Sequence, residues 1–160
     1  MTRRTSFHDQ QFRDPKWDPD DLGEFIPNLV FIGMAFDRPG MDEVHRTIKD
    51  ECKKLHLKTI RVDENVGSGL VIRDIVKLIE DAEFLVFDLT HERPNVYYEL
   101  GYAHGVGNEA GDVLLLAREG TCLHFDVAPM RVHYYVSSEQ LREVLGRSLT
   151  EMIRITRRLG

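Results

Sequence analysis

One stretch of the sequence concentrates side chains that can do chemistry. It begins at Asp88, which ends an apolar run, and it reaches Glu99 through the polar segment 90–93. A carboxylate at the end of a buried strand lies at the carboxyl edge of a sheet, where ligands of open α/β sheets bind. We expect Asn95 to cap the next helix, so that Glu99 lies near the positive helix end, which favours its ionised form. An ionised carboxylate there can attack an electrophile or stabilise positive charge.

The same residues also have a simpler interpretation. Asp88 would then only cap the following turn, and Glu99 would lie on a solvated helix face. Against it, the neighbours of Glu99 in segment 98–103 are largely apolar or aromatic. Gly101 and Gly105 fall on one helical face, and we expect them to allow a close approach of this helix to the sheet or to a ligand. We therefore place Asp88 and Glu99 together in one cleft.

The elements that would position these groups alternate along the chain. The apolar patterns predict five strands and four helices. Such alternation implies right-handed crossovers and a parallel sheet, so we predict a flavodoxin-like α/β fold, an open sheet of about five strands with helices on both faces. The strands are expected at 29–34, 59–62, 84–88, 113–117 and 132–136, and the helices at 42–55, 71–81, 95–106 and 137–158.

The chain is long enough for one domain. It has 160 residues, and domains commonly hold about 100 to 200. Residues 1–27 are polar and carry three prolines, so we predict an N-terminal extension there and one α/β domain over 28–160.

Three segments together resemble a known superfamily. The runs 88–90 and 94–105, with the opening 31–37, are similar to the superfamily that joins nucleoside 2-deoxyribosyltransferases to bacterial TIR-like proteins. The resemblance covers roughly residues 29–136 and implies a helix-borne glutamate that attacks or stabilises C1′ of a ribose while an N-glycosidic bond breaks. Glu99 matches that position. The implied substrates are deoxynucleosides and nucleoside monophosphates in one branch and NAD in the other.

The chemistry agrees with these residue types. Cleavage develops oxocarbenium character at C1′, which a carboxylate can stabilise or capture covalently. A cationic nicotinamide leaves unaided, whereas a neutral base needs a proton or a hydrogen bond. Asp88 or a tyrosine such as Tyr98 would supply it, and Asn95 would orient the substrate.

Further candidates follow the first two strands. The backbone amides of Gly33, Met34, Ala35 and Phe36 could hold a phosphate or ribose, with Arg38 adding charge. Arg61 and Asp63 follow the second strand and could reach ribose hydroxyls or phosphate, although an exposed charged loop explains them equally well. The catalytic candidates are thus Glu99 and Asp88, and the substrate-binding candidates are Gly33, Met34, Ala35, Phe36, Arg38, Arg61, Asp63, Asn95 and Tyr98.

The charge balance restricts the partners. With 27 acidic and 21 basic residues the net charge is −6, which argues against non-specific binding of nucleic acid. No apolar run is long enough to span a membrane, and the N-terminus lacks the apolar middle of a secretory signal, so we predict a cytoplasmic protein. The expected partner is a small-molecule nucleotide or nucleoside, held by local cations, and self-association into a homo-oligomer is left open.

No cofactor or metal is expected, and NAD enters only as a substrate. None of the seven histidines falls in a metal-binding motif, and we expect Cys52 and Cys122 to be buried, reduced thiols. We predict cleavage or transfer at the N-glycosidic bond of a nucleotide or nucleoside. One alternative is a non-catalytic TIR-like module that senses nucleotides or self-assembles. Another is a flavin-binding or response-regulator protein, but the acidic pair that a response regulator would carry at the end of the first strand is missing from the sequence.

Overall fold

The computed structural model describes residues 25–61, 72–108, 111–124, 126–127 and 130–158. Strands and helices alternate through most of these residues, close to the predicted positions. The elements are β1 (Ile26–Gly33), α1 (Met41–Lys54), β2 (Lys58–Arg61), α2 (Ile72–Asp81), β3 (Ala82–Asp88), α3 (Pro94–Gly105), β4 (Val113–Arg118), β5 (Val132–Tyr135) and α4 (Ser138–Arg158).

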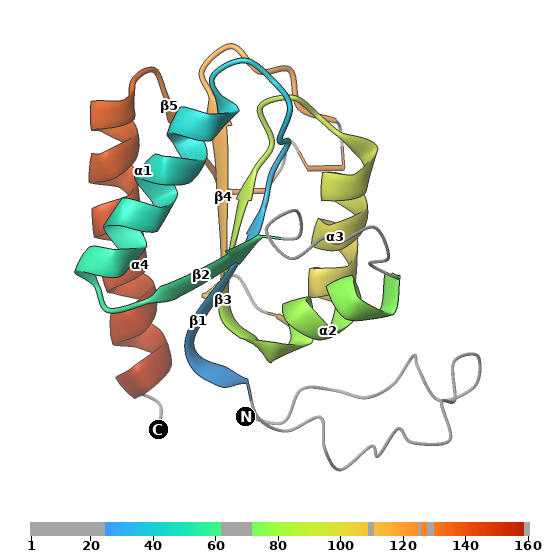
Figure 1. Cartoon of the computed structure of the whole chain (residues 1–160), viewed down its shortest axis with the longest axis vertical. Helices are drawn as coiled ribbons and strands as arrows, with labels where there is room; N and C mark the ends of the chain where they lie inside the picture. The colour runs from blue at the N-terminus through green and yellow to red at the C-terminus, as the bar shows by residue number, and fades with distance from the viewer. Residues whose placement is uncertain (1–24, 62–71, 109–110, 125, 128–129, 159–160) are drawn as a thin grey trace.

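The five strands form one sheet in the order β2-β1-β3-β4-β5, and every described pairing is parallel. Helices α1 and α4 cover one face, while α2 and α3 cover the other (Figure 1). The predicted five-stranded parallel sheet with helices on both faces is therefore confirmed. Strand order reverses between β1 and β3, so the crevice at their carboxyl ends is where such a sheet accepts a ligand.

The first strand begins earlier than predicted. β1 starts at Ile26, so residues 26–27, which we assigned to the N-terminal extension, belong to the sheet. The register of β1 against β3 shifts between Ile26 and Val30, and Asn28 there has a φ of 66°. This irregularity interrupts the apolar pattern that marks a strand, which is why the pattern placed the start at residue 29. Residues 1–24 lie outside the described part of the chain.

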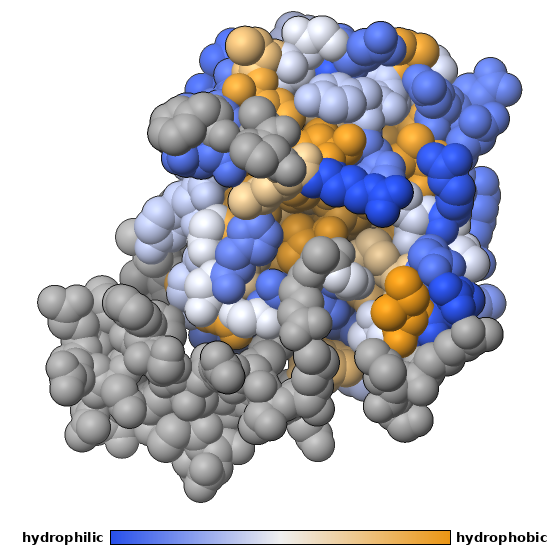
Figure 2. Space-filling view, turned by 180° about the vertical axis from the view of Figure 1, so that it is seen from behind, coloured by the Kyte–Doolittle hydropathy of each residue, from blue (hydrophilic) through white to orange (hydrophobic). Residues whose placement is uncertain are grey.

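Each face of the sheet has its own apolar core. Side chains alternate between the faces, so Val30 and Ile32 pack under α1 and α4, whereas Phe31 packs under α2 and α3. Burial of each large apolar side chain contributes about 1.5–3 kcal/mol to folding. On the face shown in Figure 2, orange apolar residues gather near the centre with blue polar residues around them. The two cores fix the helices on the sheet and thereby position the side chains at its carboxyl edge.

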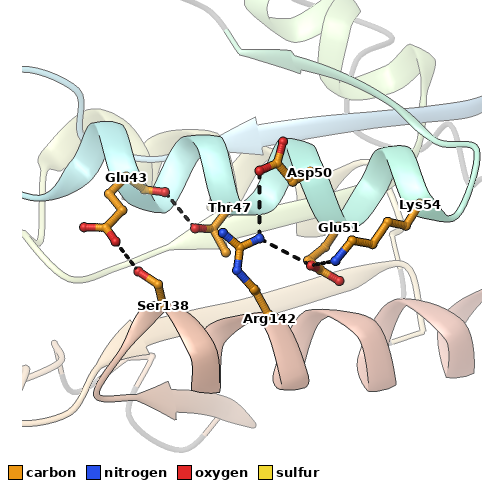
Figure 3. Close-up of polar contacts among 7 residues, drawn as sticks. All are labelled: Glu43, Thr47, Asp50, Glu51, Lys54, Ser138 and Arg142. Atoms are coloured by element: carbon orange, nitrogen blue, oxygen red, sulfur yellow. Dashed lines mark hydrogen bonds and ion pairs between the residues drawn. The ribbon is translucent and has the colours of Figure 1, made fainter.

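Helices α1 and α4 pack side by side along a polar seam (Figure 3). Ser138 Oγ donates to Glu43 Oε1 at 2.6 Å, and Arg142 Nη1 lies 3.8 Å from Asp50 Oδ2 and 3.5 Å from Glu51 Oε1. Solvent-exposed ion pairs contribute only about 0–1 kcal/mol each. The seam therefore sets the register of the two helices, while the core beneath them supplies most of the stability.

The amino edge of the sheet is fastened by the end of α4. Arg157 Nε lies 3.2 Å from Glu83 Oε1, and Arg157 Nη2 donates to Asn28 Oδ1 at 2.6 Å. The backbone N–H of Asn28 donates to Glu83 Oε2 at 2.6 Å. Arg157, although half exposed, thus ties the end of α4 to β1 and β3. The edge opposite to the candidate site is thus closed by internal contacts.

The two cysteines differ in environment. Cys52 is fully buried in the α1 core, as predicted, but Cys122 is exposed, and both are free thiols. Cys122 follows β4 in an irregular segment outside the apolar cores, which is why the prediction of burial is wrong there. Within the described residues, none of the helices combines the length and the apolar character needed to cross a membrane.

Candidate active site

Glu99 lies on the buried face of α3. The buried residues of this helix are Val96, Glu99, Leu100 and Ala103, which form the stripe expected of a helix packed on a sheet. Glu99 is only 5% exposed. The interpretation of Glu99 as part of a solvated helix face is therefore wrong. A carboxylate on the packed face of a helix is costly to the fold unless it is paired or takes up a proton.

A close backbone approach places Glu99 against the end of β1. A Cβ built on Gly33 would lie 3.2 Å from Glu99 Oε2 and 2.4 Å from two ring atoms of Phe87. The Phe87 ring in turn packs against Phe31, with ring centroids 6.0 Å apart. Only glycine leaves room for both the ring and the carboxylate at this point. The structure thus joins Gly33 and Glu99, two predicted site residues that are distant in the sequence.

Burial changes the ionisation of Glu99. It raises the pKa of the Glu99 carboxyl from 4.5 to about 7, because burial disfavours the charged form. Among the described residues, none hydrogen-bonds to this carboxylate or forms an ion pair with it. A buried acid without a partner and with a pKa near neutrality is typical of functional sites. Near pH 7 it holds or releases a proton with little free-energy cost.

The start of α3 differs from the prediction. The helix begins at Pro94, its first residue, and Arg93 is the N-cap with extended backbone and no capping side-chain hydrogen bond. Asn95, predicted as the cap, is the second helical residue and is exposed. Proline suits the first helical position, because its missing N–H would have no helical partner there. The shift leaves Glu99 in the second turn, beyond the first turn in which the helix dipole acts most strongly, so the expected stabilisation of its ionised form is not found.

Asp88 is held by hydrogen bonds within the protein. Its Oδ2 accepts the Tyr135 hydroxyl at 2.6 Å, and its Oδ1 accepts the Thr90 backbone N–H at 2.9 Å. Burial raises the pKa of the Asp88 carboxyl, and these bonds oppose the shift. Burial, and then the neighbouring Asp88 carboxylate, raise the pKa of Tyr135. The capping of the turn after β3, which we weighed as the simpler role of Asp88, is thus present.

Asp88 and Glu99 point to opposite faces of the sheet. Phe87 packs in the core beneath α2 and α3, so the next side chain of β3 turns toward α1 and α4. Tyr135, which receives Asp88 there, belongs to the α1 and α4 core. Glu99 lies on the other face, beside Gly33. The expectation that both carboxylates line one cleft is not met, because strand alternation separates them.

Two of the side chains in the segment after β1 point into the core. Met34 and Ala35 are buried in the α1 core, at 3% and 5% exposure, so only their backbones can face a ligand. Phe36 is exposed, and Arg61 at the end of β2 places its Cζ 5.8 Å from the Phe36 ring centroid. Arg61 itself is buried. Cation–π contact therefore joins two further predicted site residues at the carboxyl edge.

The remaining candidates do not converge by any described contact. Arg38, Asn95 and Tyr98 are exposed. The described contact of Arg38 is made by its backbone, whose carbonyl accepts the Met41 N–H at 3.2 Å. Asp63 lies outside the described residues. No group of three His, Cys, Asp or Glu side chains in the described part of the chain is placed to hold a metal ion.

The glycines of α3 do not mark a close approach. A Cβ built on Gly101 or Gly105 would meet nothing within 4 Å, and both residues are exposed. The expectation that they bring the helix close to the sheet or a ligand is wrong, because Glu99, Leu100 and Ala103 form the contact face instead.

Sequence reasoning missed three contacts at this edge. Thr90 Oγ1 accepts the Arg118 backbone N–H at 3.0 Å, and the Tyr135 hydroxyl reaches Asp88, so the ends of β3, β4 and β5 are tied together. Asp37 also pairs with Arg93. No local sequence motif marks Tyr135 as a site residue. Because Tyr135 is the last residue of β5, the convergence of the carboxyl strand ends is the signal that could have placed it near Asp88.

The comparisons with known proteins bear on the fold. No family model matches this chain, and no curated protein matches it. A flavo di-iron protein from Thermotoga maritima is similar in structure, with a TM-score of 0.60 and 14% identity, over 81% of this chain and 37% of that one. A flavoprotein from the same organism gives a TM-score of 0.60 and 15% identity over the same shares.

The fold is flavodoxin-like. This confirms the predicted class. Because this chain spans only 37% of the flavo di-iron chains, the comparison concerns their shared α/β domain alone. A further neighbour is matched over nearly its whole length: a CMP N-glycosidase from Clostridium botulinum, with a TM-score of 0.51 and 16% identity, over 72% of this chain and 96% of that one. At that identity the likeness shows a common fold.

Proposed function

We propose that this protein cleaves the N-glycosidic bond of a nucleotide, with Glu99 as the group that acts on C1′. The observation that carries the proposal is the environment of Glu99, a buried carboxylate without a described partner, set against Gly33 in the β1–β3 crevice. The similarity to a CMP N-glycosidase supports the same reaction class. The resemblance of segment 94–105 to deoxyribosyltransferases supports it independently.

Glu99 would act in its ionised form. As the bond between C1′ and the base nitrogen breaks, its electron pair leaves with the base and positive charge develops on the sugar ring. The carboxylate stabilises that charge or bonds to C1′ as an ester, which water or a second base then displaces. A neutral leaving base takes a proton from solvent.

Asp88 takes a supporting role in this mechanism. Both of its oxygens are engaged, by Tyr135 and by Thr90, on the face away from Glu99. It would hold the turn from which α3 starts and thereby fix Glu99 over the end of β1. The predicted catalytic pair becomes one reacting carboxylate, Glu99, and one positioning carboxylate, Asp88.

A nucleoside monophosphate is the substrate that we favour among the predicted ones. Arg61 and the exposed Phe36 offer a cation and a ring at the carboxyl edge, the positions at which a phosphate and a base can be held. The net charge of −6 would repel a phosphorylated ligand at long range, so local cations must hold it. The activity of the CMP N-glycosidase neighbour agrees with this choice.

The test is a substrate panel with identification of products. Wild type is incubated with nucleoside monophosphates, deoxynucleosides and NAD, and the free base and the sugar product are quantified by chromatography. The proposal predicts equal amounts of base and sugar product from at least one nucleoside monophosphate. Thermal stabilisation by a nucleotide without release of any base would instead support the non-catalytic sensing module and contradict the proposal.

A further inference from the structure

The outer side of β5 is unpaired. β5 is an edge strand, and among the described residues it pairs with β4 alone. The Tyr135 carbonyl accepts a backbone N–H that follows β4 at 2.9 Å, so the backbone groups of Tyr135 point toward β4. Because these groups alternate along a strand, those of Val132 and Tyr134 point away from the sheet. The row ends at Val136, whose N–H donates to Gln140 Oε1 at 2.7 Å. Such a row is a template for pairing with another strand.

The side chains along this edge form an exposed apolar stripe. Val132 packs in the core beneath α2 and α3, so Tyr134, two residues on, lies on the same face. Tyr134 is 44% exposed, Val136 is 57% exposed, and Met130, just before β5, is 37% exposed. Edge strands are commonly protected by charged side chains or by proline. The opposite edge strand, β2, begins with the exposed Lys58, whereas β5 carries no lysine, arginine, acid or proline.

The edge of β5 is complementary to itself. Antiparallel pairing of two β5 strands about a two-fold axis at His133 sets Val132 of each copy opposite Tyr134 of the other. Each of these two pairs exchanges two N–H···O bonds, which uses the outward backbone groups. The same register brings Met130 near Val136 of the second copy. The exposed apolar side chains thereby cover one another on one face of a continuous sheet.

The charges at the two ends of β5 are complementary under the same symmetry. Arg131 is exposed directly before β5, and Glu139 is exposed in the first turn of α4, beyond the other end of the strand. Arg131 precedes Tyr135 by four residues, so alternation directs it to the face that α4 covers. Antiparallel pairing reverses the strand, so Arg131 of each copy reaches the Glu139 end of the other.

The centre of this arrangement brings two uncharged rings together. Burial, and then the nearby Arg131 and Arg147, lower the pKa of His133 from 6.5, so the imidazole is neutral near pH 7. Glu143 lies one turn before Arg147 on the exposed surface of α4, so the charge of Arg147 is balanced within each copy. The two His133 side chains therefore meet at the axis without repelling each other.

We infer that this protein forms a homodimer in which the β5 strands of two copies pair antiparallel about His133. A second copy is the occupant that fits, because the apolar and charged groups at this edge complement themselves. An interface of one short strand from each copy is small, so the dimer should exchange with the monomer. The inference stands apart from the chemistry of Glu99.

Sedimentation velocity of the full chain measures the association. A reducing agent keeps the exposed Cys122 from cross-linking. Wild type should pass from monomer toward dimer between about 1 and 200 µM. Tyr134→Lys should weaken the dimer by about tenfold or more, because it places a charge in the paired edge. Tyr98→Lys changes an equally exposed tyrosine on α3 and should associate as wild type does.

Charge reversal tests the complementary ends. Arg131→Glu and Glu139→Arg should each associate more weakly than wild type, since like charges then meet at both ends of the strand pair. An equal mixture of these two variants should form a heterodimer, because unlike charges are restored at both ends. A mixture that associates no better than the separate variants would contradict the arrangement.

Cross-linking tests the register. At the axis the two residues 133 form a non-hydrogen-bonded pair with Cα atoms about 4.5 Å apart, a separation that a disulfide can span. With Cys122→Ser as background, His133→Cys should give a disulfide-linked dimer on mild oxidation. Val136→Cys in the same background should not, because its two copies would lie about 20 Å apart.

The inference is overturned if wild type stays monomeric at every concentration, if Tyr134→Lys dimerises as wild type does, or if both cysteine variants cross-link equally. If His133→Cys does not fold, the mixture of charge-reversed variants still decides.

Discussion

Gly33 Cα and the Glu99 carboxylate lie so close that a Cβ on Gly33 would be 3.2 Å from Glu99 Oε2. The contact joins the end of β1 to the second turn of α3, two places more than sixty residues apart in the chain. It puts the carboxylate at the β1–β3 crevice, where strand order reverses. The position of the Glu99 carboxylate therefore depends on the absence of a side chain at Gly33.

Gly33→Ala should disturb both stability and activity. The added methyl group would lie 2.4 Å from Phe87 ring atoms, so the ring or the α3 carboxylate has to move. Overpacking of this kind costs about 1–3 kcal/mol. Chemical denaturation of the variant measures the loss, and base release by the folded variant should fall because Glu99 is displaced.

Gly101→Ala is the matched control for this substitution. A Cβ at Gly101 meets nothing within 4 Å and lies within α3, so alanine should raise the free energy of unfolding by up to about 1 kcal/mol. Equal stability changes in the two variants would contradict the close approach of Gly33 to Glu99.

Replacement of Glu99 should change the pH dependence of stability. Burial raises its folded-state pKa from 4.5 to about 7, so folding takes up a proton between these values and wild type loses stability as pH rises through them. At about 1.4 kcal/mol per pKa unit, the loss is on the order of 3 kcal/mol above pH 7. Glu99→Gln lacks this loss, so its stability relative to wild type should rise by that amount between pH 4 and pH 8.

Denaturation curves of wild type and Glu99→Gln at several pH values give this difference. Glu143→Gln, exposed on α4, is the control and should follow wild type throughout. A stability difference between Glu99→Gln and wild type that does not change with pH would show that Glu99 titrates normally.

Tyr135→Phe should destabilise the protein through Asp88. The variant removes the hydroxyl that donates to the buried Asp88 Oδ2 at 2.6 Å, which leaves that oxygen without a described donor. A lost buried hydrogen bond to a charged group costs about 1–3 kcal/mol. The folded-state pKa of Asp88 should rise further, so the loss should be larger at pH 8 than at pH 4.

Tyr134→Phe provides the comparison, because Tyr134 lies on the same strand but is 44% exposed. It should unfold like wild type at both pH values. If Tyr135→Phe did the same, the bond to Asp88 would not hold the end of β5.

Ligand binding and base release by Tyr135→Phe give a second readout. If this variant binds ribose 5-phosphate nearly as wild type does but releases less base, Tyr135 acts through the position of Glu99.

The two thiols should react at very different rates. Cys122 is exposed, whereas Cys52 is buried in the core, and burial raises the pKa of its thiol to about 12. A thiol reagent at pH 8 should label one cysteine quickly in the native protein and the second only on unfolding. Cys122→Ser should abolish the fast phase, and labelling of two thiols in the folded protein would contradict the burial of Cys52.

The sequence was sufficient for the fold, because the alternation of apolar strands and amphipathic helices reports which faces are buried. It placed Glu99 on the helix that follows the third strand, and in the structure this residue lies on the face of α3 that approaches the end of β1 at Gly33. It did not show that Asp88 faces the other side, since that depends on the phase of alternation at the end of β3. A shift by one residue reverses the face, and the apolar run 84–87 is buried on both sides.

The polar contacts between loops were also beyond sequence reasoning. Tyr135 reaches Asp88 across β4, and Arg93 reaches Asp37 across the crevice, so each pair depends on strand order and loop shape together. The left-handed backbone at Asp37 and Glu92 has no sequence signal as strong as glycine would give. Asn95 looked like the helix cap, but proline at the first helical position moved the start to Pro94.

The most direct test of the central claim is the rate of base release by Glu99→Gln. The rate is measured at pH 8, above the Glu99 pKa of about 7, with saturating amounts of the nucleoside monophosphate that wild type consumes. Loss of the carboxylate should lower kcat on the order of 10²–10³-fold, with KM little changed, while Glu143→Gln keeps the wild-type rate. Base release by folded Glu99→Gln at the wild-type rate would contradict the assignment of Glu99 as the catalytic residue.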